Sequence, residues 1–134
     1  MNKQERIQLQ EWVELHRSCA VCWWPESDGR RALHVHHLVQ GQHRHKAHHP
    51  KCYLRLCQRC HEVLHNGKLV GNFPDLTKGM MLTAKQESDP DNYDIQHLCE
   101  ISNRKGLAYE PQPIPQWYLN ERQANVYGWN TRNP

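Results

Sequence analysis

Six cysteines and eleven histidines give this 134-residue chain a large supply of metal ligands. Four of the cysteines form two CxxC pairs on either side of residues 23 to 56. A CxxC turn places two thiolates on one side of a tetrahedral ion, and two such turns complete a structural zinc site. Unrelated surface turns or a redox site are the alternatives, but two such pairs in one short chain favour zinc. The sequence therefore predicts Zn²⁺ held by Cys19, Cys22, Cys57 and Cys60.

Seven of the histidines fall within the stretch LHVHHLVQGQHRHKAHHP, residues 33 to 50. Imidazole is both a metal ligand and a proton acceptor near neutral pH. Further along, His61 and His65 stand four residues apart, which puts both on one face of a predicted helix. Helices use that spacing to hold a transition metal with two imidazoles, although a lone pair of this kind is more often a surface feature.

Taken in order, the chain shows Cys-x2-Cys, a strand ending in His36-His37, a polar loop, and Leu-Cys-x2-Cys-His-x3-His. Over about residues 19 to 67 this pattern resembles the HNH endonucleases of the ββα-metal (His-Me finger) group. The resemblance implies that His37 is the general base that takes a proton from water beside the scissile phosphate. The resemblance also implies that the four cysteines form a structural zinc site. A catalytic divalent ion (Mg²⁺, Mn²⁺, Ni²⁺ or Zn²⁺) would be held by His36, His61 and His65. A set of imidazoles favours Mn, Co, Ni or Zn over Mg.

Two features depart from a simple match. Neighbouring residues of a regular strand face opposite sides, so His36 and His37 can serve one site only if the strand ends or bulges there. In addition, Cys52 stands where the family has the Asn that helps to orient the base. The sequence leaves open whether Cys52, a loop histidine such as His48 or His49, or nothing takes over that role.

Basic residues are concentrated between the two CxxC pairs. The segment from Gly29 to His61 carries seven basic residues and no acid; the whole chain carries +3 and this segment +7, so the remainder carries −4. Such a separation indicates a phosphate-binding face, with a solvated charged loop as the alternative. His43, His45, His48 and His49 would lie in the same phosphate-facing loop. The predicted partner is DNA, with RNA not excluded, and the predicted contacts are Arg44, Lys46, Lys51, Arg55 and Arg59.

The predicted fold class is α+β, with a small ββα-metal (HNH) core that carries the paired CxxC knuckles. Residues 1–70 would form this core, from a helix at 3–17 with an apolar face of Ile7, Trp12 and Leu15, through two strands within 32–38 and 52–57, to a helix at 58–66. Trp23 and Trp24 are expected to pack over the first knuckle, with stacking on a base as the alternative.

Residues 71–134 would form a mainly helical and extended C-terminal extension that packs on the core. A short helix followed by a turn is expected at 75–90, an amphipathic helix within 93–106, and an extended stretch at 110–117, where prolines alternate. The tail beyond carries scattered aromatic residues, which should pack on the core or form a partner-binding arm.

These observations predict a metal-dependent HNH endonuclease that hydrolyses phosphodiester bonds of DNA. We expect nicking with low sequence specificity, because no base-reading module such as a helix-turn-helix is visible. Similar modules serve phage packaging, restriction, recombination and repair. The main alternative is a non-catalytic, zinc-dependent nucleic-acid-binding module, and a protein-interaction zinc domain is a second. The charged N-terminus and the lack of a long apolar run predict no membrane partner and a cytoplasmic location.

Overall fold

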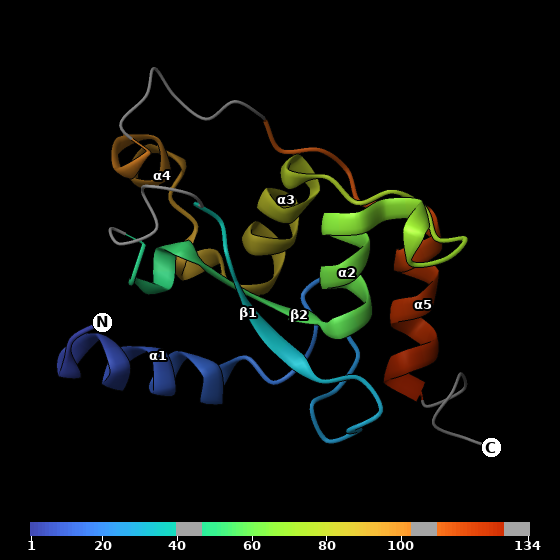
Figure 1. The fold of residues 1–134 in the computed structure, drawn as a ribbon, viewed down its shortest axis with the longest axis horizontal. Helices are drawn as coiled ribbons and strands as arrows, with labels where there is room; N and C mark the ends of the chain where they lie inside the picture. The colour runs from blue at the N-terminus through green and yellow to red at the C-terminus, as the bar shows by residue number, and fades with distance from the viewer. Residues whose placement is uncertain (40–46, 103–109, 128–134) are drawn as a thin grey trace.

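The computed structural model describes residues 1–39, 47–102 and 110–127 and has a mixed α+β fold, as predicted (Figure 1). Within these ranges there are five α-helices and one two-stranded antiparallel sheet. The elements are α1 (Lys3–Leu15), β1 (Leu33–His37), β2 (Tyr53–Cys57), α2 (Gln58–Asn66), α3 (Lys78–Ser88), α4 (Ile95–Ile101) and α5 (Gln116–Tyr127), with short 3-10 turns between some of them. None of these helices has both the length and the apolar character needed to cross a membrane.

A hairpin followed at once by a helix forms the centre of the fold. The two strands pair in regular register from Leu33 opposite Cys57 to His37 opposite Tyr53. The helix α2 begins directly after β2, and its first turn is capped by the Cys57 sulfur, which accepts from the backbone N–H of Cys60 at 3.5 Å. The helix ends at Asn66, and the residue that caps it, Gly67, has a φ of 55°, in the region that favours glycine. The strand–strand–helix order predicted for this region is therefore present.

The strand β2 is buried along its whole length, so both faces of the hairpin are covered. Side chains of β1 alternate across the sheet. His34 and His36 lie on the face that α2 covers, in ring contact with His61. His37 lies on the other face, in ring contact with Tyr53. The hairpin thus presents neighbouring histidines to two different environments.

A buried ion pair joins α3 to that second face. Lys85 is fully buried, and its Nζ donates to the backbone oxygens of Pro50 and Tyr53, both at 2.7 Å, and to Asp89 at 2.6 Å. Asp89 also accepts from the indole N–H of Trp12 at 2.8 Å. Burial opposes the charge of Asp89, but hydrogen bonds from His16, Lys85 and Trp12 outweigh it and hold the pKa of Asp89 well below its usual range. This network fixes α1 and α3 to the start of β2.

The helix α1 differs from its prediction in how it is held. It ends two residues earlier than expected, and of the predicted apolar face only Trp12 is buried, whereas Ile7 is 43% and Leu15 80% exposed. The Asn2 side chain caps the helix by accepting from the backbone N–H of Glu5 at 2.8 Å. In return, the Glu5 carboxylate accepts from the backbone N–H of Asn2. Capping and the single Trp12 anchor therefore replace the continuous apolar stripe, and the prediction for Ile7 and Leu15 was wrong.

The helix α5 was not predicted, because its inward face is mostly polar. Its buried residues beyond Tyr118 are Glu121, Arg122 and Asn125. Hydrophobic periodicity cannot reveal a helix whose buried positions are charged or amide side chains. The helix nevertheless packs on the core, which agrees with the expectation for this part of the tail; Trp129 lies outside the described residues.

We predict that Asp89→Asn lowers the free energy of unfolding by about 3 kcal/mol, because it leaves the Lys85 ammonium buried without its carboxylate. Asp91→Asn is the matched control, since Asp91 is exposed on the following turn. Urea denaturation of the metal-loaded proteins measures both. Equal stability of the two variants would show that the buried pair does not hold the fold.

His16 gives a pH-dependent contribution to stability. Burial opposes its charge and Lys85 adds to that opposition, but the contact with Asp89 at 3.4 Å raises the pKa of His16 above 6.5. A raised pKa stabilises the folded state below the unfolded pKa, and the effect is lost as pH rises through the folded pKa. We therefore expect His16→Asn to destabilise the protein more at pH 6 than at pH 8 in urea denaturation. An equal loss at both pH values would contradict this assignment.

Candidate metal centres

The four predicted cysteines come together as one buried group. Each is fully buried, and their sulfur atoms all lie within 4.8 Å of one another. The Cys22 and Cys57 sulfurs are 3.7 Å apart. Four sulfurs at about 2.3 Å from a tetrahedral zinc would be about 3.8 Å apart, so the observed spacing is close to that of a zinc site. This group could hold a metal ion such as zinc.

Backbone hydrogen bonds place the two CxxC turns against each other. The first turn follows α1 and closes through Cys19 N–H to the Trp24 oxygen (2.9 Å) and Trp23 N–H to the Cys19 oxygen (2.9 Å). Trp23 occupies the turn position with φ 65°, a conformation that non-glycine residues adopt only under constraint. The N–H of Ala20 donates to the Arg55 oxygen at 2.8 Å and so attaches this turn to β2, which leads straight into the second turn.

Hydrogen bonds within the group act differently on its thiols. They lower the pKa of the Cys57 thiol, with Cys19, Cys22 and Cys60 as its partners, and they raise the pKa of the Cys22 and Cys60 thiols well above the usual range. Zinc is bound by thiolates, so a divalent ion would be needed for all four to ionise together. Trp24, which is 1% exposed, packs in the same core cluster, as expected, whereas Trp23 is 42% exposed.

Three of the predicted histidines form a second group. His36 comes from β1, and His61 and His65 come from successive turns of α2; one ring nitrogen of each lies within 4.8 Å of the others. Ring centroids are 5.4 Å apart for His36–His61, 5.7 Å for His36–His65 and 4.7 Å for His61–His65. His36 is 5% exposed while His65 lies at the surface, so the group is closed on the hairpin side and open towards solvent.

Two of these imidazoles, His36 and His61, have lowered pKa values, which favours the neutral form that binds metals. Burial, together with the neighbouring His61 and His65, lowers the pKa of His36 to about 3. Burial and His65 also lower the pKa of His61. The Nδ1 atoms of His34 and His61 are hydrogen-bonded at 3.1 Å, which orients the His61 ring. With Nδ1 engaged in this way, Nε2 is the nitrogen of His61 that is available to a metal. His34, on the same face of β1 as His36, therefore contacts the ring of a candidate ligand.

His37 lies next to this group and is not one of its members. The strand β1 ends at His37 in regular register, without a bulge, so its ring is on the opposite face from His36. It makes edge-to-face contacts with Tyr53 (5.5 Å) and His48 (6.1 Å). The structure thus brings the three predicted ligands together and places the predicted base at the end of the same strand, with its ring on the opposite face of the hairpin.

Cys52 holds the chain next to His37 through its backbone and not through its side chain. Its oxygen accepts from the N–H of Leu38 at 2.8 Å, which holds the chain just beyond His37. Its side chain is fully buried, and burial raises the pKa of the thiol to about 11, so the thiol is neutral. Of the groups considered for orienting His37, His48 is the one whose ring contacts it, while His49 contacts His97 at 5.4 Å.

The basic segment is neutralised in space. Each of its described arginines and lysines lies near a carboxylate from outside the segment, in the pairs Arg30–Asp28, Arg31–Glu121, Lys51–Asp94, Arg55–Glu26 and Arg59–Glu121. Arg55 and Arg59 are largely buried in these pairs, so their guanidinium groups are already engaged. Arg44, Lys46, His43 and His45 lie outside the described residues. The separation of charge seen along the sequence is therefore not preserved among the described residues.

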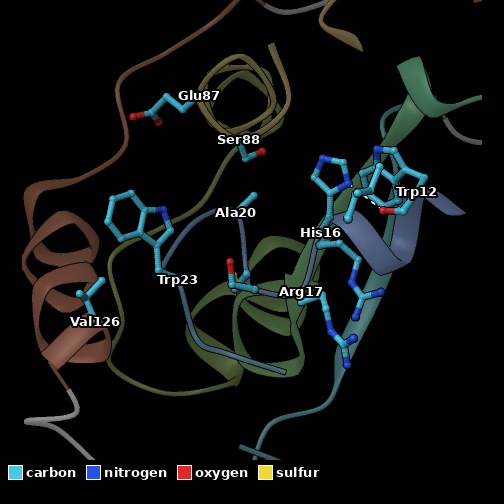
Figure 2. A pocket seen from close by; sticks show the side chains of 12 residues that line it. Trp12, His16, Arg17, Ala20, Trp23, Glu87, Ser88 and Val126 are labelled. Carbon is cyan, nitrogen blue, oxygen red and sulfur yellow. Dashed lines mark hydrogen bonds between the residues drawn. The ribbon is translucent and has the colours of Figure 1, made fainter. Parts of the chain in front are cut away.

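A cavity of about 360 Å³ lies between the end of α1, the first CxxC turn, the end of α3 and α5 (Figure 2). Trp12 and His16 line one side and Trp23 and Val126 the other. None of the three clustered histidines, nor His37, lines it. The three-histidine group therefore lies outside this cavity, whereas Cys19 of the four-cysteine group is among its lining residues.

Comparisons with protein-family models, with curated proteins and with solved structures found no match to this chain.

We predict that the purified full-length chain holds one tightly bound zinc and that Cys57→Ser loses it, because oxygen is a poorer ligand for this four-sulfur site. Cys99→Ser is the matched control, since Cys99 is a half-buried cysteine outside the group. Metal analysis after dialysis measures zinc per chain. Retention of zinc by Cys57→Ser, or its loss from Cys99→Ser, would contradict the ligand assignment.

Proposed function

We propose that this protein is a metal-dependent endonuclease of the HNH type, with a structural zinc on the four cysteines and a catalytic divalent ion on His36, His61 and His65. The observation that supports it most strongly is the three-histidine group on a hairpin–helix unit with a further histidine at the end of the same strand. A binding module would have no need of this arrangement. The order of motifs that resembles HNH enzymes supports the same conclusion.

The ligand set suits hydrolysis of a phosphodiester. Three protein ligands leave coordination positions for oxygen atoms, and the exposed side at His65 gives a substrate access. A divalent ion bound there supplies Lewis-acid stabilisation of charge on the phosphate and on the leaving oxygen. Neutral imidazoles favour Mn, Co, Ni or Zn as that ion.

His37 has the role of general base in this proposal. His37 follows the ligand His36 at the end of β1, with its ring on the opposite face of the hairpin. The role therefore requires the ring to approach the attacking water around the end of the strand. A neutral imidazole accepts the proton of that water and passes it on to solvent. Contacts with Tyr53 and His48 restrict the ring on this face of the hairpin.

DNA is the proposed substrate, and RNA shares the phosphodiester chemistry. Because Arg55 and Arg59 are largely buried in their ion pairs, we leave them out of the proposed surface. Lys51, one-third exposed in its pair with Asp94, remains in it together with Arg44 and Lys46. With so few phosphate contacts, binding should be weak, nonspecific and sensitive to salt.

The test is nicking of supercoiled plasmid by metal-stripped protein with Mg²⁺, Mn²⁺, Ni²⁺ or Zn²⁺ added, alongside a labelled RNA. We expect cleavage with at least one metal. His37→Ala should reduce the single-turnover rate by about 100-fold or more, because it removes the general base. His36→Ala should raise the metal concentration needed for cleavage. His97→Gln is the control, because His97 has no role in the proposal.

Zinc content measured on every variant separates loss of chemistry from loss of fold. Cleavage that survives equally in His37→Ala would identify a contaminant or a different base. If all the folded, zinc-loaded proteins bind DNA and none cuts with any metal, the nuclease proposal fails. The non-catalytic zinc module then becomes the better description.

A further inference from the structure

We propose that α5 forms the outer wall of the four-cysteine site, so that metal retention and docking of this helix depend on each other. The inference rests on the zinc assignment made above and not on nuclease activity. It gives a function to a segment that lies about 60 to 100 residues from the cysteines in the chain.

The first observation is a set of hydrogen bonds from α5 to the first CxxC turn. Arg122 Nε donates to the Val21 oxygen at 2.7 Å, and its terminal nitrogen donates to the Ala20 oxygen at 3.3 Å. Asn125 Nδ2 donates to the Cys22 oxygen at 2.7 Å. Three successive carbonyls of the turn thus have their partners on one distant helix.

The strained residue of the turn is held by the same helix. The Arg122 guanidinium lies 4.9 Å from the centre of the Trp23 ring, and Glu87 of α3 pairs with Arg122 at 3.2 Å. The positive φ of Trp23 belongs to the turn that presents Cys19 and Cys22. Removing Arg122 would therefore release the backbone that positions two of the four ligands.

The second observation concerns charge. Four thiolates and one divalent ion leave two negative charges in excess within a buried site. The Arg59 guanidinium lies 3.5 Å from the Cys60 sulfur, and that of Arg31 lies 4.0 Å from the Cys22 sulfur. These two cations offset the excess charge where it would otherwise be costly to bury.

The helix α5 keeps these cations in place. Glu121 accepts two hydrogen bonds from Arg59 and lies 3.8 Å from Arg31. Arg59 is also enclosed by aromatic rings, with Trp117 and Tyr118 of α5 at 5.3 and 5.7 Å. The carboxylate of Glu121 adds one negative charge of its own, so α5 does not supply the offsetting charge; it holds the ligand backbone directly and keeps Arg59 and Arg31 against the sulfurs.

Linkage makes this relation reciprocal: if docking of α5 tightens metal binding by some factor, metal binding tightens docking by the same factor. Residues that orient metal ligands typically change metal affinity by about 10–100-fold when they are removed. If α5 only packed near the site, its removal would leave metal affinity unchanged, and metal binding would leave the docking of α5 unchanged.

The experiment uses the full chain loaded with Co²⁺ or Zn²⁺, with release followed after addition of a chelator. We expect Asn125→Ala and Arg122→Ala to release metal at least about 10-fold faster than the parent. Gln123→Ala, on the exposed side of α5, should match the parent. Arg59→Gln should also shift the sulfur-to-cobalt charge-transfer band, because it removes a cation from the Cys60 sulfur; Arg30→Gln is the control for that change.

Hydrogen exchange gives the reverse direction, with faster exchange of the α5 amides expected when the metal is withdrawn. If Arg122→Ala fails to fold, Asn125→Ala still tests the inference, because it deletes a single hydrogen bond to the first CxxC turn and should leave the protein folded. Release at the parent's rate from a folded Asn125→Ala, with α5 exchange unaffected by metal, would overturn the inference. A parent that holds no metal on its cysteines would instead overturn the zinc assignment itself.

Discussion

The meeting of two CxxC turns at one buried point is the constraint on which the rest of this structure depends. One turn follows α1 and the other joins β2 to α2, so the four sulfurs determine where the hairpin and its helix lie. That placement brings His36 of β1 opposite His61 and His65 of α2. A metal on the cysteines would therefore stabilise the histidine site as well, because both groups share α2.

Buried polar contacts replace much of the apolar core that a chain of this size would otherwise need. Only 37% of the residues are hydrophobic. Lys85 with Asp89, and Arg59 with Glu121, form ion pairs that are each protected from solvent and anchored by further hydrogen bonds. Such pairs stabilise only when every partner is present, since a single buried charge is costly. The fold is consequently specified by particular partners more than by general burial.

The features that could be predicted from the sequence are those set by local spacing. The CxxC pairs and the His61–His65 interval predicted six of the seven side chains in the two groups, because turn and helix geometry fix which neighbours share a side, and the family resemblance added His36. What could not be predicted depends on partners far away in the chain. The described basic residues of the segment pair with Glu26, Asp28, Asp94 and Glu121, and the polar inward face of α5 becomes favourable only against the carbonyls of the first turn. His37 could be predicted only in part. The alternation of side chains along a strand predicts that it faces away from His36, but its neighbours Tyr53 and His48 are known only from the three-dimensional structure.

We propose that a metal bound only by sulfur organises both candidate sites. The most direct test is X-ray absorption at the zinc edge on the purified chain loaded with a single zinc. We predict a shell of four sulfurs at about 2.3 Å. A shell that contains nitrogen or oxygen at that loading, or a chain that folds fully without metal, would contradict this proposal.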